Sequence, residues 1–194
     1  MRRLTLDDIA DARAYERERK AFRDQVMEVK RRRRIPVGPI VTLLFENRDT
    51  IRFQIQEMAR VEKLYSDEQI ITELDVYNPL IPEPGRLSAT LFVELTSRPQ
   101  LEEWLPKLVG IERAVELRIG DDVVRSEVEE AHGEQLTRAD VTPSVHYIRF
   151  RLTPEQVDAF ARGPVELAVA HPAYQEATVL SDDTRAELLH DLRE

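Results

Sequence analysis

The sequence of 194 residues contains no cysteine, and this absence excludes several kinds of chemistry. Without a thiol the chain can form no disulfide, no cysteine-type zinc site and no nucleophilic thiolate, and it cannot hold an iron–sulfur cluster by itself. The first twenty residues also lack the apolar stretch of a secretory signal, so we expect no such signal. We therefore predict a cytoplasmic protein.

Glycine is scarce, with only six residues, and the glycine-rich motifs of nucleotide binding are missing. There is no G-x-x-x-x-G-K-[ST], no G-x-G-x-x-G and no G-x-S-x-G, which argues against a phosphate loop and against a hydrolase nucleophile elbow. No run approaches the roughly 18 apolar residues needed to span a bilayer, so we expect no membrane segment. These absences argue against common nucleotide-binding, hydrolase and membrane-spanning proteins.

The charge is plentiful but unevenly distributed. Charged residues make up 34% of the chain and the net charge is −9, yet residues 1–34 carry 12 Lys/Arg against 7 Asp/Glu. We expect this basic arm to dock on the acidic body of the chain or on a second copy. The alternative is nucleic-acid binding through a basic cluster, and no aromatic residues are interleaved with it to support that function. The cluster is Lys30, Arg31, Arg32, Arg33 and Arg34.

The first half of the chain reads as mostly helical. A charged helical stretch over 5–34 ends at the "IPVGP" of 35–39, because proline cannot continue a helix. A short strand at 40–46 and helices at 46–63 and 66–76 follow. Three prolines and a glycine over 77–85 mark a rigid boundary. We expect one structural unit with four parts: an arm (1–34), a strand with two covering helices (35–85), an α+β core (86–180) and a C-terminal helix (181–194).

The second half has a regular order of elements. Strand, helix, strand, strand, helix and strand are predicted at 88–96, 97–110, 114–120, 144–152, 153–163 and 164–172. Thr153 before Pro154, with a glycine after the last turn, is typical helix punctuation. The order β-α-β-β-α-β is that of a ferredoxin-like split βαβ sandwich. We therefore predict an α+β fold of this type, covered by the N-terminal elements.

The helix over 46–63 places polar side chains in or beside its apolar stripe. Gln54 and Glu62 fall on the face of Ile51 and Ile55, and Glu57 lies on its shoulder. A buried carboxylate needs a cation, a histidine, a metal or water. The stripe therefore lines either a ligand site or a wet structural crevice. Other candidate lining residues are Arg60, Tyr77, Asn78 and Tyr174.

Two histidines fall on the apolar faces of predicted strands. His146 alternates with Ile148 and Phe150, and His171 lies in phase with the apolar residues of its own strand. With Glu57, and with Glu62 as a further candidate, they form a donor set suited to a single zinc, iron or manganese ion, or to acid–base chemistry. The alternative is that both histidines are satisfied structural residues. No Glu-x-x-His is present, so a carboxylate-bridged di-iron site is not encoded in its usual form.

Several segments together resemble a bacterial family described only as domain of unknown function 3501. They are "GPIVTLLFENR", "QIQEMARVEK", "ELDVYNPLIP", "LVGIE", "SVHYIRF" and "HPAY". The resemblance implies a genomic context of rubrerythrin-like and iron–sulfur redox proteins, and assigns no catalytic residues. We therefore expect a non-catalytic accessory protein of a redox or peroxide-defence system, with a protein partner or a second copy. A metal- or ligand-binding enzyme is the first alternative and a nucleic-acid binder the second.

Overall fold

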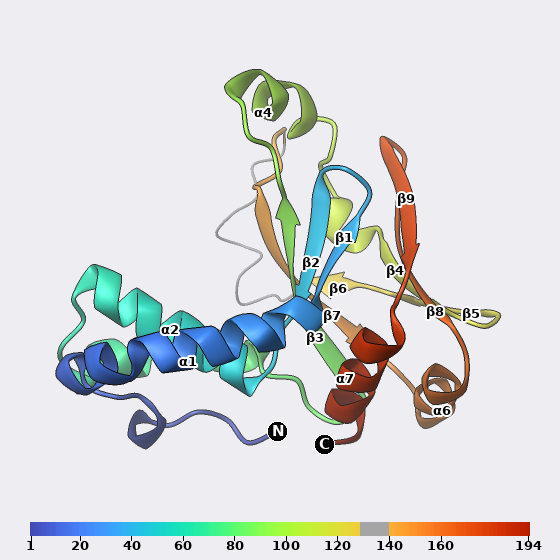
Figure 1. Cartoon of the computed structure of the whole chain (residues 1–194). Coiled ribbons are helices and arrows are strands. Elements are labelled where there is room, and N and C mark those ends of the chain that lie inside the picture. Colours follow the sequence, from blue (N-terminus) through green and yellow to red (C-terminus); the bar gives the residue numbers. More distant parts are fainter. Residues whose placement is uncertain (129–139) are drawn as a thin grey trace.

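The computed structural model describes residues 1–128 and 140–194 as a β unit with a layer of helices extending from one side (Figure 1). The five-stranded sheet of the β unit has the order β1-β2-β3-β7-β6, and its neighbouring strands are antiparallel. Its strands are β1 (Arg34–Val37), β2 (Val41–Phe45), β3 (Arg86–Val93), β6 (Glu127–Val128) and β7 (Val145–Arg151). The N-terminal hairpin β1–β2 thus occupies one side of the central strand β3.

A second antiparallel sheet has the order β5-β4-β8-β9. Its strands are β4 (Val115–Ile119), β5 (Asp122–Arg125), β8 (Val165–His171) and β9 (Tyr174–Val179). Only Ser126 separates β5 from β6, so the chain passes here from one sheet into the other. At a different edge, the Tyr174 hydroxyl donates a hydrogen bond of 2.6 Å to the carbonyl oxygen of Val37 in β1. The two sheets therefore meet at both corners.

The main core lies between the sheets, because apolar residues alternate along the strands. Leu43 and Phe45 of β2 are completely buried in this core, as are Ile148 and Phe150 of β7. Phe160 and Leu188 from two helices complete this core. These helices are α6 (Pro154–Arg162) and α7 (Asp182–Arg193), while α4 (Arg98–Trp104) projects from the other end of the β unit (Figure 1).

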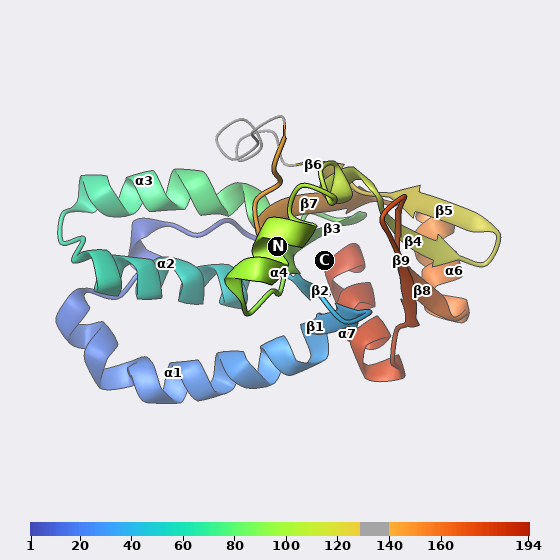
Figure 2. The same cartoon turned by 90° about the horizontal axis from the view of Figure 1, so that it is seen from above.

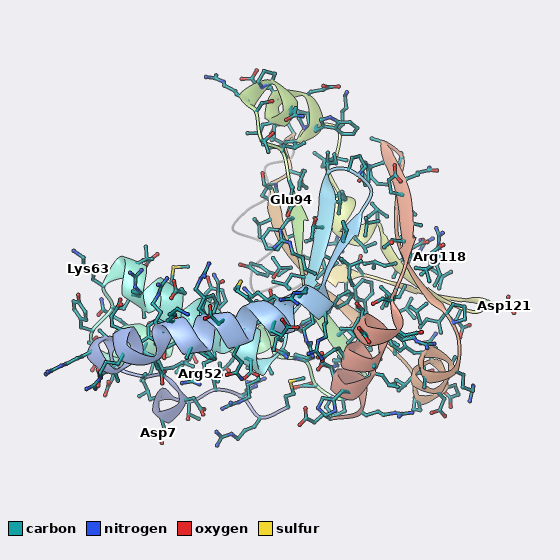
Figure 3. All side chains as sticks on the ribbon, in the orientation of Figure 1. Asp7, Arg52, Lys63, Glu94, Arg118 and Asp121 are labelled. Atoms are coloured by element: carbon teal, nitrogen blue, oxygen red, sulfur yellow. The ribbon has the colours of Figure 1, made fainter. Side chains whose placement is uncertain are left out.

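Three helices lie side by side in the helical layer (Figure 2). They are α1 (Ala12–Arg33), α2 (Arg48–Glu62) and α3 (Asp67–Tyr77). Asp11, Asn47 and Ser66 cap their first turns by accepting backbone N–H groups. Lys63, at the far end of the layer (Figure 3), ends α2 in the left-handed conformation at φ 57°. Each helix start therefore follows from a capping side chain in the sequence.

The layer has its own apolar contacts, separate from the core between the sheets. Tyr15, Phe22 and Val26 of α1 pack against Phe53 of α2. A second cluster joins α2, α3 and the N-terminal residues, and consists of Leu4, Ile51, Ile55, Leu74, Tyr77, Leu80 and Ile81. Tyr147 of β7 packs against the second cluster, so the layer covers one face of the five-stranded sheet. No helix within residues 1–128 or 140–194 has the length and apolar character of a membrane span.

The α+β class is confirmed, but the strand pairing differs from the predicted ferredoxin-like sandwich. That sandwich places the four strands of its repeat in one sheet, whereas β3 pairs with β7 in one sheet and β4 pairs with β8 in the other. The order of elements along the chain does not determine hydrogen-bonding partners. Here β2 occupies one edge of β3 and β7 occupies the other, so neither edge is free for β4 or β8. Part of the predicted 35–39 break is itself the strand β1.

Candidate anion-binding site

The face of the five-stranded sheet that lies under the helices is polar. In β3, Ser88 and Thr90 point to this face, and their partners across the ladder are Arg149 and Tyr147 of β7. Ser88 is only 2% exposed and Thr90 is also buried. Polar groups in such a place need hydrogen-bonding partners, from the protein or from a ligand. This polar face is therefore the first place to look for a binding site.

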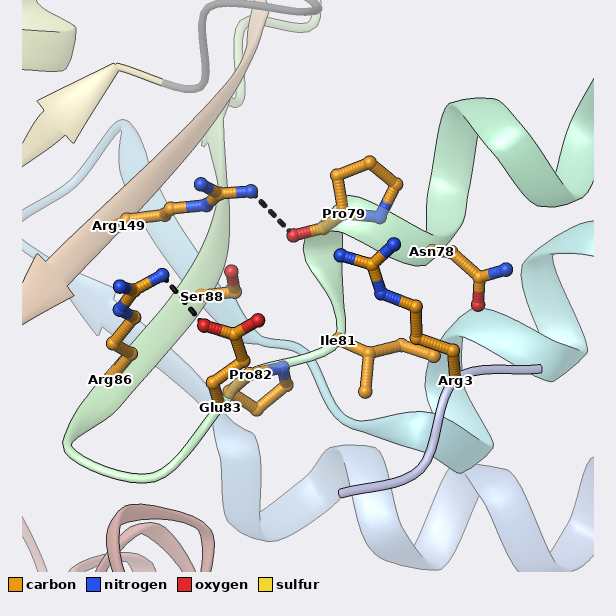
Figure 4. Close-up of a pocket in the computed structure, with 9 residues that line it drawn as sticks. All are labelled: Arg3, Asn78, Pro79, Ile81, Pro82, Glu83, Arg86, Ser88 and Arg149. Atoms are coloured by element: carbon orange, nitrogen blue, oxygen red, sulfur yellow. Dashed lines mark hydrogen bonds and ion pairs between the residues drawn. The ribbon is translucent and has the colours of Figure 1, made fainter.

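A pocket of about 120 Å³ opens at the end of this face (Figure 4). Three arginines line it, and they come from segments far apart in the sequence: Arg3, Arg86 and Arg149. The rest of the lining is Ser88 together with Asn78, Pro79, Ile81, Pro82 and Glu83. Proline has no backbone N–H, so the two prolines supply no donor to the pocket. Much of the donor capacity of the site is thus carried by guanidinium groups.

Two of the arginines are held in place by neighbours in the pocket. Arg149 donates a hydrogen bond of 2.6 Å to the carbonyl oxygen of Pro79. Arg86, the first residue of β3, forms an ion pair of 2.8 Å with Glu83 (Figure 4). The hydrogen bond to Pro79 orients the Arg149 guanidinium at the edge of the pocket. Glu83 is the only acidic residue among the lining residues that the structure describes.

The third guanidinium, that of Arg3, lies on the N-terminal segment. Among residues 1–128 and 140–194, no carboxylate lies within ion-pair distance of Arg3. Arginine offers donors in a planar fork that matches the oxygens of a carboxylate or a phosphate. A pocket with three such groups and a serine can therefore hold a small oxyanion.

A buried carboxyl group lies farther along the same sheet face. Glu46 follows β2, and its two oxygens accept hydrogen bonds of 2.5 Å from the hydroxyls of Thr50 and Thr90. Burial raises the pKa of Glu46, and the two hydroxyls only partly oppose that change. Tyr147 lies nearby and shares a hydrogen bond with Tyr77; burial raises the pKa of Tyr147 to about 12. These groups connect the helical layer to the sheet through polar contacts.

The histidines predicted as metal ligands have separate partners. Nε2 of His146 lies 3.1 Å from the Thr142 hydroxyl, and its Nδ1 lies 3.8 Å from a carboxylate oxygen of Glu112. Burial lowers the pKa of His146. Nε2 of His171 lies 3.0 Å from the carbonyl oxygen of Val109, and its Nδ1 accepts from the amide of Ala173. Both rings thus take part in local structural contacts.

The predicted carboxylates also lie elsewhere. Glu57 accepts two hydrogen bonds of 2.8 Å from Arg19 and one of 2.7 Å from the Tyr15 hydroxyl, so it joins α2 to α1. Hydrogen bonding by Arg19 is the main cause that lowers the pKa of Glu57. Glu62 is exposed near the end of α2. In the part of the chain that the structure describes, no three His, Asp or Glu side chains are grouped as metal ligands.

The five residues predicted to line a pocket have different roles. Asn78 lines the arginine pocket. Gln54 and Tyr77 are hydrogen-bonded to each other between α2 and α3. Arg60 is exposed and pairs with Glu16 of α1. Tyr174 joins β9 to β1, as described above.

The basic cluster over residues 30–34 is engaged within the chain. Lys30 lies over the Phe53 ring, 5.2 Å from its centroid. The four arginines that follow form ion pairs with carboxylates: Arg31 with Glu28, Arg32 with Glu187, Arg33 with Asp191 and Arg34 with Glu94. The basic arm therefore docks on the acidic body of its own chain.

The sequence-based prediction missed Arg3, Arg86, Ser88 and Arg149. A signal for three of them was present, because strand alternation places Arg86 with Ser88 and Arg149 with Tyr147 on the faces opposite the apolar residues. From the sequence alone, this polar face of the two strands looks like a solvent-exposed face. Arg3 lies in an irregular segment with no periodic pattern, and only the tertiary structure brings it to the pocket.

Fold and site together define a class: a two-sheet α+β protein with a helical layer and an arginine-lined pocket at the end of a polar sheet face. The chain belongs to the family described as "Protein of unknown function (DUF3501)", whose model matches residues 3–192. A crystal structure of a novel protein of unknown function from Burkholderia pseudomallei is similar, with a TM-score of 0.91 and 36% identity over 98% of this chain and 100% of that chain. No curated protein matches the sequence.

Proposed function

We propose that this chain is a non-catalytic accessory protein that binds a small anionic group, a phosphate or a carboxylate, in the arginine pocket. One observation carries the proposal: Arg3, Arg86 and Arg149 come from three remote segments and line one cavity of about 120 Å³. Guanidinium groups that converge in one cavity can donate several charge-assisted hydrogen bonds to the oxygens of a single bound anion. Arg3 has no carboxylate partner among the described residues, so its guanidinium is the one that a bound anion stabilises most.

The matched pair Arg2 and Arg3 offers a sharp test. Arg3 lines the pocket, whereas the neighbouring Arg2 pairs with Asp8 at 3.0 Å and is not part of the lining. We expect Arg3→Gln to weaken binding of inorganic phosphate by roughly ten- to a hundredfold, the cost of a lost charge-assisted contact. Arg2→Gln should change the affinity less than about twofold, because exposed charges contribute little.

The measurement is an NMR titration at low ionic strength with inorganic phosphate and, separately, with acetate, following backbone amides and arginine Nε–H signals. Stronger binding of phosphate than of acetate assigns the site to phosphoryl groups, and the reverse order assigns it to carboxylates. Equal losses in Arg2→Gln and Arg3→Gln would show a general effect of net charge and contradict the pocket as the site.

We place this activity in the cytoplasm beside the redox proteins that the family resemblance implies, with one of them or a second copy as the partner. A chain without cysteine supplies no thiol or cluster of its own, which supports an accessory role rather than an electron carrier. Sedimentation of the native protein with and without candidate redox partners tests this association. No contact in the described residues favours the metal-enzyme alternative, so we carry it no further.

A further inference from the structure

The N-terminal segment, residues 1–10, is tied to the helical layer before α1 begins. It contains one short helix, η1 (Leu6–Asp8), and otherwise has no regular structure. Arg3 belongs to this segment, so one of the three pocket arginines depends on how the segment is held (Figure 4). We refer to residues 1–10 as the strap.

A side-chain amide clamps the strap beside the pocket. Asn78 precedes Pro79 at the start of η2 (Asn78–Leu80). Its Oδ1 accepts a hydrogen bond of 2.8 Å from the Leu4 amide, and its Nδ2 donates one of 3.0 Å to the Leu4 carbonyl oxygen. Both backbone polar groups of Leu4 are thus satisfied by one side chain, as in a strand pair. The residue that is clamped directly follows Arg3.

A second amide clamp holds the other end of the strap. Oε1 of Gln56 accepts a hydrogen bond of 2.7 Å from the Ala10 amide, and its Nε2 donates one of 3.2 Å to the Ala10 carbonyl oxygen. Gln56 is 2% exposed, so its amide is well shielded from competing water. Between the clamps, Arg52 donates a hydrogen bond of 2.7 Å to the Asp8 carbonyl oxygen.

One apolar side chain anchors the strap beside Arg3. Leu4 is 3% exposed and packs in the cluster formed by α2, α3 and η2. It is not part of the pocket lining. The side chain of residue 4 therefore faces the helices, whereas that of residue 3 lines the pocket. The contacts that hold Leu4 therefore also place Arg3 at the pocket.

We propose that the strap is a closing element of the anion site, positioned by Leu4 and Asn78, so that strap attachment and anion binding strengthen each other. The inference rests on the proposed function. An anion that contacts Arg3 binds only the attached state well, and by linkage it stabilises that state by the same factor. Leu4 and Asn78 are positioning residues in this scheme.

The test compares four proteins: the natural chain, Leu4→Ala, Arg3→Gln and the double variant. Phosphate affinity is measured by calorimetry, and hydrogen exchange of the Leu4 and Ala10 amides is measured with and without phosphate. Leu4→Ala should weaken phosphate binding by about tenfold or more, because a buried leucine anchor is lost. In the Arg3→Gln background, Leu4→Ala should have almost no further effect. Phosphate should slow exchange at Leu4 in the natural chain only.

The outcomes separate this inference from the proposed function. If phosphate binds and Arg3→Gln weakens it, but Leu4→Ala acts equally in both backgrounds, the strap inference is overturned and the anion site stands. Unchanged exchange at the Leu4 amide on saturation with phosphate also overturns the strap alone. Absence of phosphate and acetate binding overturns both. Circular dichroism of each variant at the titration temperature verifies that the chain is folded.

Discussion

Arg33 and Asp191 are 158 positions apart and form a buried, two-point ion pair between α1 and α7. Nη1 of Arg33 lies 2.5 Å from one carboxylate oxygen of Asp191, and Nη2 lies 3.0 Å from the other. The side chain of Arg33 is 2% exposed and that of Asp191 is 0% exposed. This contact fixes the end of the helical layer to the C-terminal helix of the β unit.

Removing one partner of this pair should destabilise the protein strongly. We expect Arg33→Gln to lower the free energy of unfolding by about 3–5 kcal/mol, because Asp191 is left as a buried charge without its cation. Arg31→Gln is the matched control: Arg31 lies in the same helix and pairs with Glu28 at 2.6 Å, but its side chain is 74% exposed. Urea unfolding measures both variants. Equal effects on the two would show that the buried pair has no special role.

Gly38 in the β1–β2 turn should tolerate no side chain. It has φ +70°, and a Cβ there would overlap the Tyr174 hydroxyl and the Glu176 side chain of β9. Gly120→Ala is the control, since Gly120 has φ +60° and open space around it. In both variants an alanine must adopt the left-handed conformation, which lowers stability by about 1–2 kcal/mol. In Gly38→Ala, overpacking lowers it by about 1–3 kcal/mol more. Gly38→Ala should therefore unfold at a lower temperature than Gly120→Ala. The opposite order would contradict the close contact of β1 with β9.

The local elements were predictable because their signals are local. Thr153 caps α6 and accepts from the Gln156 amide, as its position before Pro154 predicted. The strand phase of His146 was also predicted, since it is buried with Ile148 and Phe150. Sheet pairing was not predictable in this way. Whether β3 pairs with β7 or with another strand depends on packing across the whole core, and no residue within either strand specifies its partner.

Glu46 should make stability depend on pH. Burial raises the folded-state pKa of Glu46 above the ordinary value of 4.5, so protonation of Glu46 favours the folded state over the unfolded state. The contribution of Glu46 to the free energy of unfolding is therefore fully present below about pH 4.5. It is lost as the pH rises through the raised pKa of the folded state. We expect Glu46→Gln, which stays uncharged, to gain stability relative to the natural chain as the pH rises from 4 to 8.

Glu57 supplies a control of opposite sign. Its pKa is lowered mainly by the hydrogen bonds from Arg19, so its contribution is present above about pH 4.5 and is lost as the pH falls through the lowered folded value. Glu57→Gln should accordingly cost most stability near neutral pH. Urea unfolding across this range measures both variants. A difference between Glu46→Gln and the natural chain that does not vary with pH would contradict the buried, hydroxyl-bound carboxyl.

The candidate site was only partly predictable. Asn78 was named as a polar residue on a rigid loop and does line the pocket. The two histidines were selected because a polar residue on an apolar strand face is conspicuous, yet the pocket lies on the opposite, polar face of β3 and β7. From the sequence such a face cannot be distinguished from a solvated one, because its cover comes from helices α1–α3 and from a strap with no periodic pattern.

Glu83 gives a prediction of increased binding, which misfolding cannot mimic. The Glu83 carboxylate forms an ion pair of 2.8 Å with the Arg86 guanidinium and adds a negative charge to the pocket. Glu83→Gln frees Arg86 and removes repulsion against an incoming anion, so phosphate should bind about two- to fivefold more tightly, as expected for a partly exposed pair. Glu127→Gln is the control, because Glu127 pairs with Arg151 at 3.4 Å and does not line the pocket. Calorimetric titration measures both, and a similar gain in the two variants would mean that net charge, rather than this pocket, sets the affinity.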